Sequence, residues 1–189
     1  TEGLPKGYYE NGQLKWEGNW EVTFKDDILE EDGLWKEYHE NGQLKLEENY
    51  KDGKKEGLWK EYHENGQLKW ETNFKDGKEE GLSKSYYENG QLFSEVNYKN
   101  DLMDGLYKSY YENGQLETEG NYKNGYREGL YKWYHENGQL KWKGNFKDGY
   151  REGLWKGYHE NGQLKGVRNF KDDELISKKC WDENFKEIN

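Results

Sequence analysis

The sequence contains one cysteine, one proline and one methionine among its 189 residues, and it has no apolar run long enough to span a bilayer. The single Cys180 excludes an internal disulfide framework. The first residue is Thr1 and no signal peptide follows it, so we expect an N-terminus trimmed from a longer product. That expectation leaves secretion or export to the cell envelope open and sets no compartment.

Negative charge is unevenly distributed along the chain. Residues 1–96 carry 13 Lys and Arg against 23 Asp and Glu, whereas residues 97–189 carry 16 of each. Nucleic acid binding needs clustered cations that displace phosphate counterions, so the charge balance argues against it. The acidic first half also makes binding to an anionic membrane unfavourable. We expect instead a protein partner of basic character.

The phrase Glu-Asn-Gly-Gln-Leu occurs seven times and organises the whole chain. The first interval is thirty residues and the next five are twenty-four, which is the pattern of a tandem repeat. Asn-Gly between alternating apolar and polar residues is a strong hairpin signal. We therefore predict one all-β repeat domain over residues 1–189, with a decayed capping unit at 171–189. The seven hairpin tips are Asn11, Asn41, Asn65, Asn89, Asn113, Asn137 and Asn161.

Two registers fit the third repeat. A two-residue turn would pair His63 with Leu68 and would divide the apolar residues between both faces. A three-residue turn with Gly66 in the left-handed region and a bulge pairs Tyr62 with Leu68. We prefer the second register because it gathers the apolar residues on one face.

With this register, four positions of each repeat form the expected core. In the third repeat they are Leu58, Tyr62, Leu68 and Phe74, and Trp70 joins them. Lys60 shares their face through its alkyl stem. The opposite face is expected to carry an ion pair between Glu61 and Lys69. Every complete repeat has Leu, Tyr, Leu and an aromatic residue at these four positions.

The segment from Trp70 to Gly81 resembles the aromatic core of MORN repeats, with Phe74, Asp76, Gly77 and Gly81 at motif positions. Its Tyr-x-Glu-Asn-Gly-Gln-Leu turn is similar to the bacterial variant in the YwqK-type antitoxin family. This resemblance implies an elongated, single-layer, twisted antiparallel sheet used for binding. Members of the antitoxin group are proposed to neutralise a toxin. The third motif residue is glycine only at Gly18, Gly120 and Gly144.

No catalytic, cofactor-binding or metal-binding residue is expected. Equivalent atoms one repeat apart should lie about 10 Å apart, too far for two histidines to share a metal. The hairpin-tip glutamates are solvated, and a general acid needs a cleft that excludes water. Cys180 lacks an activating environment. The four histidines are His39, His63, His135 and His159.

A row of aromatic residues on the face opposite the expected core is the candidate partner-binding surface. Rigid rings give a large contact area at a small entropic cost. Alternatively, neighbouring long side chains cover the row and make it a thin second core. The row consists of Trp35, Trp59, Tyr107, Tyr131 and Trp155, with Trp133 beside it.

Two irregular links are further candidate contacts. The link after Trp20 is six residues longer than its counterparts and contains Phe24, Ile28 and Leu29. It is either a recognition loop or a longer hairpin that caps the N-terminal edge. The central link has Leu102 and Met103 where other repeats have glycine and a charge, through partner contact or through local packing.

The last unit departs from the motif at its turn. Trp181 takes the core tyrosine position, and Phe185 in place of the turn glycine is expected to spoil the turn. Taken together, the sequence predicts a non-enzymatic protein–protein interaction scaffold, with an antitoxin or immunity-like role as its most concrete form. The alternatives are a cell-wall or glycan-binding module and a lipid-headgroup-binding module.

Overall fold

The computed structural model describes residues 4–19, 23–25, 28–30 and 32–188. Strands and turns account for the regular structure of these residues, and no helix able to cross a membrane occurs among them. The chain divides into two compact units, one within residues 1–91 and 98–101, the other within residues 92–97 and 102–189. We describe each unit by itself.

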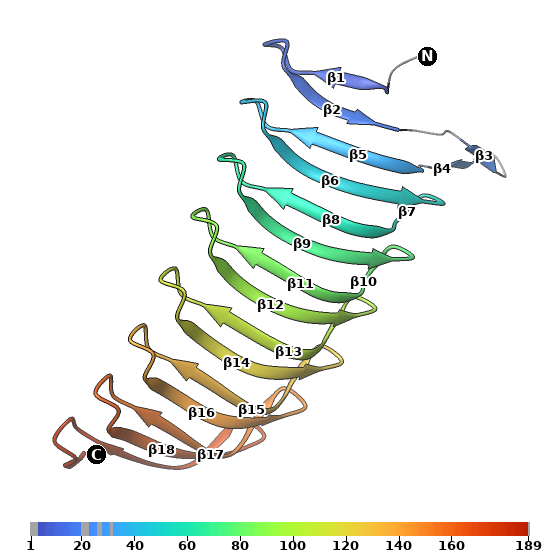
Figure 1. Cartoon of the computed structure of the whole chain (residues 1–189). Helices are drawn as coiled ribbons and strands as arrows, with labels where there is room; N and C mark the ends of the chain where they lie inside the picture. The colour runs from blue at the N-terminus through green and yellow to red at the C-terminus, as the bar shows by residue number, and fades with distance from the viewer. Residues whose placement is uncertain (1–3, 20–22, 26–27, 31, 189) are drawn as a thin grey trace. The chain divides into compact units, whose positions relative to one another are not determined.

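Unit 1 is a series of antiparallel hairpins in which each hairpin pairs with its neighbours in the series (Figure 1). Within the long link, Thr23–Lys25 pairs antiparallel with Ile28–Glu30 as a separate two-stranded sheet. The strands are β1 (Lys6–Tyr8), β2 (Leu14–Gly18), β3 (Thr23–Lys25), β4 (Ile28–Glu30), β5 (Gly33–Tyr38), β6 (Leu44–Lys51), β7 (Lys54–Lys55), β8 (Gly57–Tyr62), β9 (Leu68–Lys75), β10 (Lys78–Glu79) and β11 (Gly81–Tyr86).

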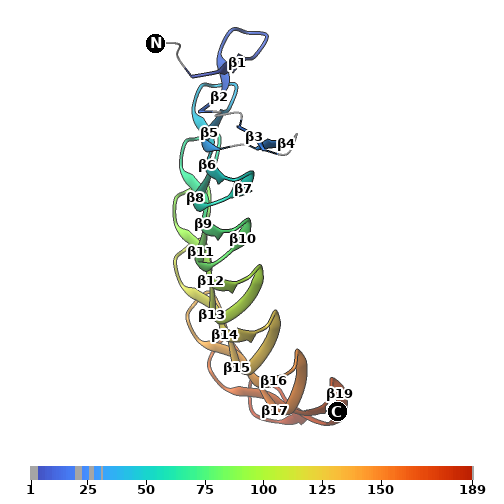
Figure 2. The same ribbon diagram turned by 90° about the vertical axis from the view of Figure 1, so that its right-hand side faces the viewer.

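Unit 2 repeats the same hairpin with longer strands. Its strands are β12 (Leu92–Lys99), β13 (Leu102–Tyr110), β14 (Leu116–Lys123), β15 (Tyr126–Tyr134), β16 (Leu140–Lys147), β17 (Tyr150–Tyr158), β18 (Leu164–Lys171), β19 (Glu174–Trp181) and β20 (Glu187–Ile188). Each unit, taken by itself, is one layer thick, as the rotated view shows (Figure 2). The predicted fold class, an all-β single-layer hairpin repeat, is confirmed.

The hairpin tip has the predicted three-residue turn. The His63 amide donates to the Gln67 carbonyl at 2.8 Å, and the Gly66 amide donates to the His63 carbonyl at 2.9 Å. Gly66 has a φ of 81°, in the left-handed region that glycine tolerates. Tyr62 pairs with Leu68, so the preferred register is confirmed.

A second bulge, which we did not predict, follows immediately. The pairing shifts from Tyr62↔Leu68 to Glu61↔Trp70, which leaves Lys69 as an extra residue in the return strand. An extra residue reverses the alternation of faces beyond it. We call the face with the Trp59, Glu61, Trp70, Thr72 and Phe74 positions the tryptophan face. The face with the Leu58, Lys60, Tyr62, Leu68, Glu71 and Asn73 positions is the tyrosine face.

The expected core is therefore wrong at two of its four positions. Leu58 is 40% exposed, and the equivalent leucines in the other complete repeats are half-buried or exposed. Phe74 and Trp70 lie on the tryptophan face, away from Leu58 and Tyr62. The buried apolar residues all belong to the tryptophan face, and they are Trp59, Val96, Tyr131, Phe146, Trp155 and Phe170.

The hairpin tips of one repeat are bonded to the next repeat. The His63 Nε2 lies 3.0 Å from the Tyr86 carbonyl oxygen, so this nitrogen carries the proton that it donates. Asn65 Nδ2 donates to the Glu88 carbonyl at 2.7 Å, and Asn65 Oδ1 accepts from the Gln67 amide at 2.9 Å. Where tyrosine replaces histidine, its hydroxyl reaches the same carbonyl, as Tyr111 does. The repeated tip phrase is thus explained by contacts between repeats.

The opposite edge of each unit carries a second set of turns. These are two-residue turns in which an Asp or Asn with positive φ precedes a glycine or Asp, as at Asp76 and Gly77. The Asp76 amide donates to Glu56 Oε2 of the preceding repeat at 2.9 Å. Equivalent bonds join Asp148 to Glu128 at 3.0 Å. Both edges therefore bind each hairpin to its neighbour.

The tyrosine face binds neighbouring repeats through tyrosine hydroxyl and carboxylate groups. The Tyr38 hydroxyl donates to Glu17 at 2.6 Å, and the Tyr134 hydroxyl donates to Glu119 at 2.8 Å. Burial, with the Glu17 carboxylate beside it, raises the pKa of Tyr38 to about 12. The Lys132 ammonium, 2.7 Å from Glu119, holds the pKa of that carboxyl below its usual value.

The last turn corrects the expectation for Phe185. The Phe185 amide donates to the Asp182 carbonyl at 3.0 Å, and the Asp182 amide donates to the Lys186 carbonyl at 2.9 Å. The turn therefore forms, and Phe185 adopts the left-handed φ of 62° in the glycine position. Its ring stacks on Trp181 with centroids 5.6 Å apart, a contact that offsets backbone strain.

Replacing the tip glycine by a β-branched residue should destabilise the fold. Gly66→Val forces valine to positive φ, which costs on the order of 1–3 kcal/mol. Gly66→Asn should cost less, because asparagine tolerates the left-handed region. Urea unfolding of the three chains measures this difference. Equal losses for Val and Asn would contradict a conformational cause.

Glu119→Gln should lower stability at pH 7 and not at acid pH. The folded pKa of Glu119 is depressed, so its ionised form adds stability above the unfolded value near 4.3, and this gain disappears as pH falls through the folded pKa. We expect a loss of about 0.5–1 kcal/mol at pH 7, small because the pair is partly exposed. Urea titrations at both pH values test this, with the exposed tip variant Glu136→Gln as control. A loss that persists at acid pH would show that charge is not its cause.

Candidate functional site

The repeats resemble one another on one face and differ on the other. On the tyrosine face, the Leu58, Tyr62, Leu68 and Asn73 positions hold the same residue in every complete repeat. On the tryptophan face, the Thr72 position holds in turn Gly18, Glu48, Thr72, Val96, Gly120, Gly144 and Arg168. The Glu61 and Trp70 positions vary as widely. The tryptophan face is therefore the surface that distinguishes one repeat from another.

The small residue at the third motif position seats a ring from the next repeat. A Cβ added to Gly144 would overlap three ring atoms of Trp155, and one added to Gly120 would overlap Tyr131. In the second repeat Glu48 takes this position, and it accepts a hydrogen bond of 2.8 Å from Trp59 Nε1 instead. Glycine at this position is thus explained by ring packing, with no ligand required.

The structure places the whole predicted aromatic row on the tryptophan face. In unit 1, Trp35 stacks on Trp16 with ring centroids 4.9 Å apart, and Trp59 packs edge-on against Trp70 at 4.5 Å. In unit 2 the row continues in a cluster. Its contacts join Tyr107 to Tyr122, Tyr122 to Tyr131, Tyr131 to Trp133 and Phe146, and Trp133 and Phe146 to Trp155.

Burial divides the row into two groups. Trp59 is 8% exposed, Tyr131 is 1% exposed and Trp155 is 7% exposed, so these rings are part of the core itself, and their expected place on the face opposite the core is wrong. Trp35 and Trp133 are half-buried, as is Tyr107. A partner can meet the second group directly. Its contact with the row stays a prediction.

Three arginines lie over the aromatic cluster of unit 2. The Arg127 guanidinium lies 5.2 Å from the Phe146 ring centroid, and that of Arg151 lies 4.1 Å from Phe170. Arg151 also forms an ion pair of 2.7 Å with Asp173. The third, Arg168, lies 4.9 Å from the ring centroid of Trp142. Stacked guanidinium groups keep their edge free to bind carboxylate or phosphate oxygens.

The tryptophan face of unit 2 is hollowed at this point. A hollow of about 290 Å³ is lined by Trp133, Trp142, Trp155 and Phe170 together with charged side chains that include Arg168. The charged residues of the lining are Lys141, Arg151, Arg168 and Glu117, and Arg151 is already paired with Asp173. An apolar hollow with a few convergent charged groups is the usual form of a recognition site.

The five residues of the two irregular links are the other predicted partner contacts. Leu102 begins β13 and is exposed, and the Met103 carbonyl accepts from the Gly125 amide at 2.8 Å. Phe24 lies in β3, and Ile28 and Leu29 lie in β4, but their side chains are outside the described residues. A contact role for these five residues stays a prediction.

The described residues contain no group of three or more His, Cys, Asp or Glu side chains that could hold a metal ion. Each of the four histidines instead bonds a backbone carbonyl of the following hairpin, at Tyr62, Tyr86, Tyr158 or Trp181. Cys180 is a half-buried free thiol. Chemistry at these residues therefore has no geometric support in the described part of the chain.

Sequence reasoning missed the arginines and Trp142. The signal was present in the comparison of repeats with one another, because Arg168 stands where the two preceding repeats have glycine.

Fold and site together define a repeat protein: in each unit a single-layer sheet of similar hairpins has one variable, aromatic face. The sequence model of a family described as a MORN repeat variant matches residues 2–21, 31–52, 55–76, 79–100, 103–124, 127–148 and 151–172. The chain belongs to this family, whose repeats are generally associated with protein or lipid binding and are typically non-enzymatic. No curated protein sequence matches the chain.

Gly144→Val tests how the rings are seated. The valine side chain overlaps Trp155, so we expect a loss of about 1–3 kcal/mol and stronger quenching of tryptophan fluorescence by acrylamide. Urea unfolding and quenching measure the two effects. Thr72→Val, at the same repeat position with a side chain already present, is the matched control. Two variants of equal stability would contradict the proposed role of the glycine.

Proposed function

We propose that the chain is a non-enzymatic scaffold that binds another protein through the tryptophan face. The observation that carries the proposal is that one face holds the same residues at most of its positions in every complete repeat, whereas the residues of the other face vary. The tip phrase, the edge carboxylates and the tyrosine face join repeats to one another, so their uniformity has a structural cause. The varied tryptophan-face residues have no such uniform task and can encode one specific partner.

Half-buried aromatic residues beside cations suit this use. Trp133 and Trp142 present ring surface beside Arg168, and tryptophan and arginine are enriched among the residues that dominate protein interfaces. A strand-built surface holds these side chains in place before binding, which lowers the entropic cost of association. The basic partner expected from the sequence would complement the charge of the acidic first half only, because residues 127–172 carry a net positive charge.

Neutralisation of a toxin is the narrower form of this proposal, suggested by the resemblance of the tip phrase to the YwqK-type antitoxins. A scaffold can inhibit a toxin by covering its active surface, which requires no chemistry from the scaffold. In this form, the captured partner should inhibit growth when expressed alone, and coexpression of the chain should relieve the inhibition.

A pull-down from lysate of the source organism tests the scaffold proposal. We expect a discrete protein partner that the intact chain retains and that Trp133→Ser loses at least about tenfold, as for a central interface residue. Leu130→Ala, at an exposed position of the tyrosine face in the same strand, is the matched control and should retain it. Urea midpoints confirm that both variants fold.

The reverse pattern, with the partner lost in Leu130→Ala and kept in Trp133→Ser, would place binding on the tyrosine face and overturn the proposal. Trp59→Ala and Trp155→Ala are unsuitable test variants because both rings are buried and their loss creates cavities.

A further inference from the structure

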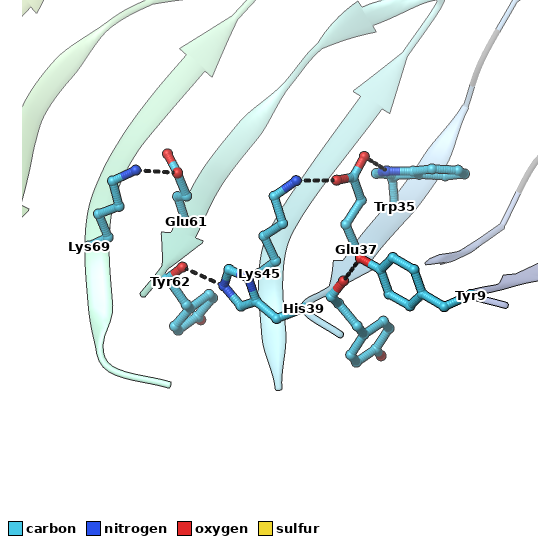
Figure 3. A network of polar contacts seen from close by, with 9 residues as sticks. Tyr9, Trp35, Glu37, His39, Lys45, Glu61, Tyr62 and Lys69 are labelled. Atoms are coloured by element: carbon cyan, nitrogen blue, oxygen red, sulfur yellow. Dashed lines mark hydrogen bonds and ion pairs between the residues drawn. The ribbon is translucent and has the colours of Figure 1, made fainter. Parts of the chain in front are cut away.

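The extra residue of the second bulge is a lysine in five of the seven complete repeats, and in the second and third repeats this lysine has a carboxylate partner. Lys45 pairs with Glu37 at 3.2 Å, and Lys69 pairs with Glu61 at 2.6 Å, the ion pair expected from the sequence (Figure 3). Both pairs lie on the tryptophan face, close to the hairpin tips. In these two repeats the bulge lysine is paired within its own repeat.

The same lysine has no such partner in the last two complete repeats. Trp133 and Gly157 stand at the positions of Glu37 and Glu61, so Lys141 and Lys165 lack the carboxylate that pairs with Lys45 and Lys69 in the earlier repeats. Lys141 and Lys165 are exposed. Among the described residues, no carboxylate lies at ion-pair distance from Lys141, Lys165 or Arg168. Three cations without a carboxylate partner therefore lie on one face of unit 2.

These cations border two adjoining hollows. The first is the hollow of about 290 Å³ that Trp133, Trp155 and Phe170 line, and Lys141 stands at its side. The second, of about 340 Å³, is lined mainly by apolar surface, with Trp181, Ile188 and Lys165 among its residues. Arg168 and Trp142 belong to both linings, so the stacked pair forms the wall between the hollows.

Three carboxylates, Glu117, Asp182 and Glu183, also line the two hollows. Glu117 Oε2 accepts from Ser109 Oγ at 3.0 Å, and Asp182 Oδ1 accepts from the amides of Asn184 and Lys186 at 2.9 and 2.8 Å. Glu183 is exposed at the rim. Glu117, Asp182 and Glu183 keep their negative charge, so the hollows carry no net positive charge; the three cations are open to a bound carboxylate because none of them has an ion-pair partner among the described residues.

We propose that this pair of hollows binds an acidic peptide segment of the partner protein. An apolar side chain fills each hollow, and a carboxylate between them meets Arg168, with Lys141 or Lys165 beside it. A guanidinium already stacked on an indole is oriented for a two-point bond to carboxylate. Alternating acidic and apolar residues supply both kinds of group, so charge complementarity selects this occupant over a basic or neutral segment. The inference rests on the proposed scaffold function and adds the chemistry of the partner.

Fluorescence anisotropy with a labelled synthetic peptide tests the proposal. The peptide has about twelve residues, long enough to cross both hollows in extended form, with Asp or Glu alternating with Leu or Phe. Asn and Gln replace the acids in the matched neutral peptide. We expect the acidic peptide to bind the full chain at least about tenfold more tightly than the neutral one, because charge-assisted hydrogen bonds are lost in the neutral form.

Protein variants locate the site. Arg168→Gln and Lys141→Gln should each weaken binding of the acidic peptide by about tenfold, and Lys69→Gln, at the matched position of unit 1, should leave it unchanged. Lys141 and Lys69 are surface positions, so their variants stay informative if Arg168→Gln destabilises the sheet. Equal binding of the two peptides, or equal affinity of all three variants, would overturn the proposal.

Two further arms separate this inference from its alternatives. If vesicles with anionic phospholipid bind in an Arg168-dependent way and the acidic peptide does not bind, the site recognises a membrane surface and the peptide proposal is wrong. If the partner captured from lysate is lost in Trp133→Ser and kept in both Arg168→Gln and Lys141→Gln, the scaffold function stands and the acidic segment is wrong.

Discussion

Each unit of this protein has no second layer to cover its sheet, and this constraint determines most of its structure. A hairpin in such a sheet can bury surface only against its own strands and the neighbouring hairpins, so contacts must recur at fixed sequence separations. They do: the tip bonds join residues 23 apart, the edge carboxylates join residues 20 apart, and the tyrosine–glutamate bonds in the middle of the sheet join residues 15 apart. A residue that serves such a ladder cannot change in one repeat without breaking a bond in the next.

This constraint also explains the unequal faces. The tyrosine face gains its cohesion from directional hydrogen bonds and ion pairs, which demand the same residues in each repeat. The tryptophan face gains its cohesion from ring packing, where different combinations fill the same space: a glycine beneath Trp155 in one repeat, and a glutamate bonded to Trp59 in another. Apolar packing tolerates such exchange provided that volume is kept. Variation is therefore concentrated on the face where a substitution costs the least stability, and that face becomes available for recognition.

The sequence predicted what depends on neighbouring residues and failed where the outcome depends on the return strand. The Asn-Gly turn, its register at Tyr62 and the Lys69–Glu61 pair follow from local turn chemistry. The bulge at Lys69 has no local marker, since nothing about a lysine in a strand indicates an extra residue. That one residue exchanges the faces of Trp70 and Phe74 and so moves the core. The candidate site was half predicted: the aromatic residues of the row share one face, but that face holds the core and is not opposite to it. The cations without a carboxylate partner became visible only when Lys141 and Trp133 were seen to line the same hollow.

The positive φ of Asp76 and its equivalents has a consequence for how such a chain can change in length. From the second repeat onward, the turns that join one repeat to the next share an Asp or Asn with positive φ, and these repeats bind their neighbours through the same few groups. Removing a whole repeat would therefore bring together two ends that already fit, and duplicating one would create only junctions that already exist. The scaffold is in this sense length-independent, whereas its recognition surface is not, because each repeat takes its own tryptophan-face residues with it. Adding or removing whole repeats would change the residues of the recognition surface and leave the hairpin architecture unchanged.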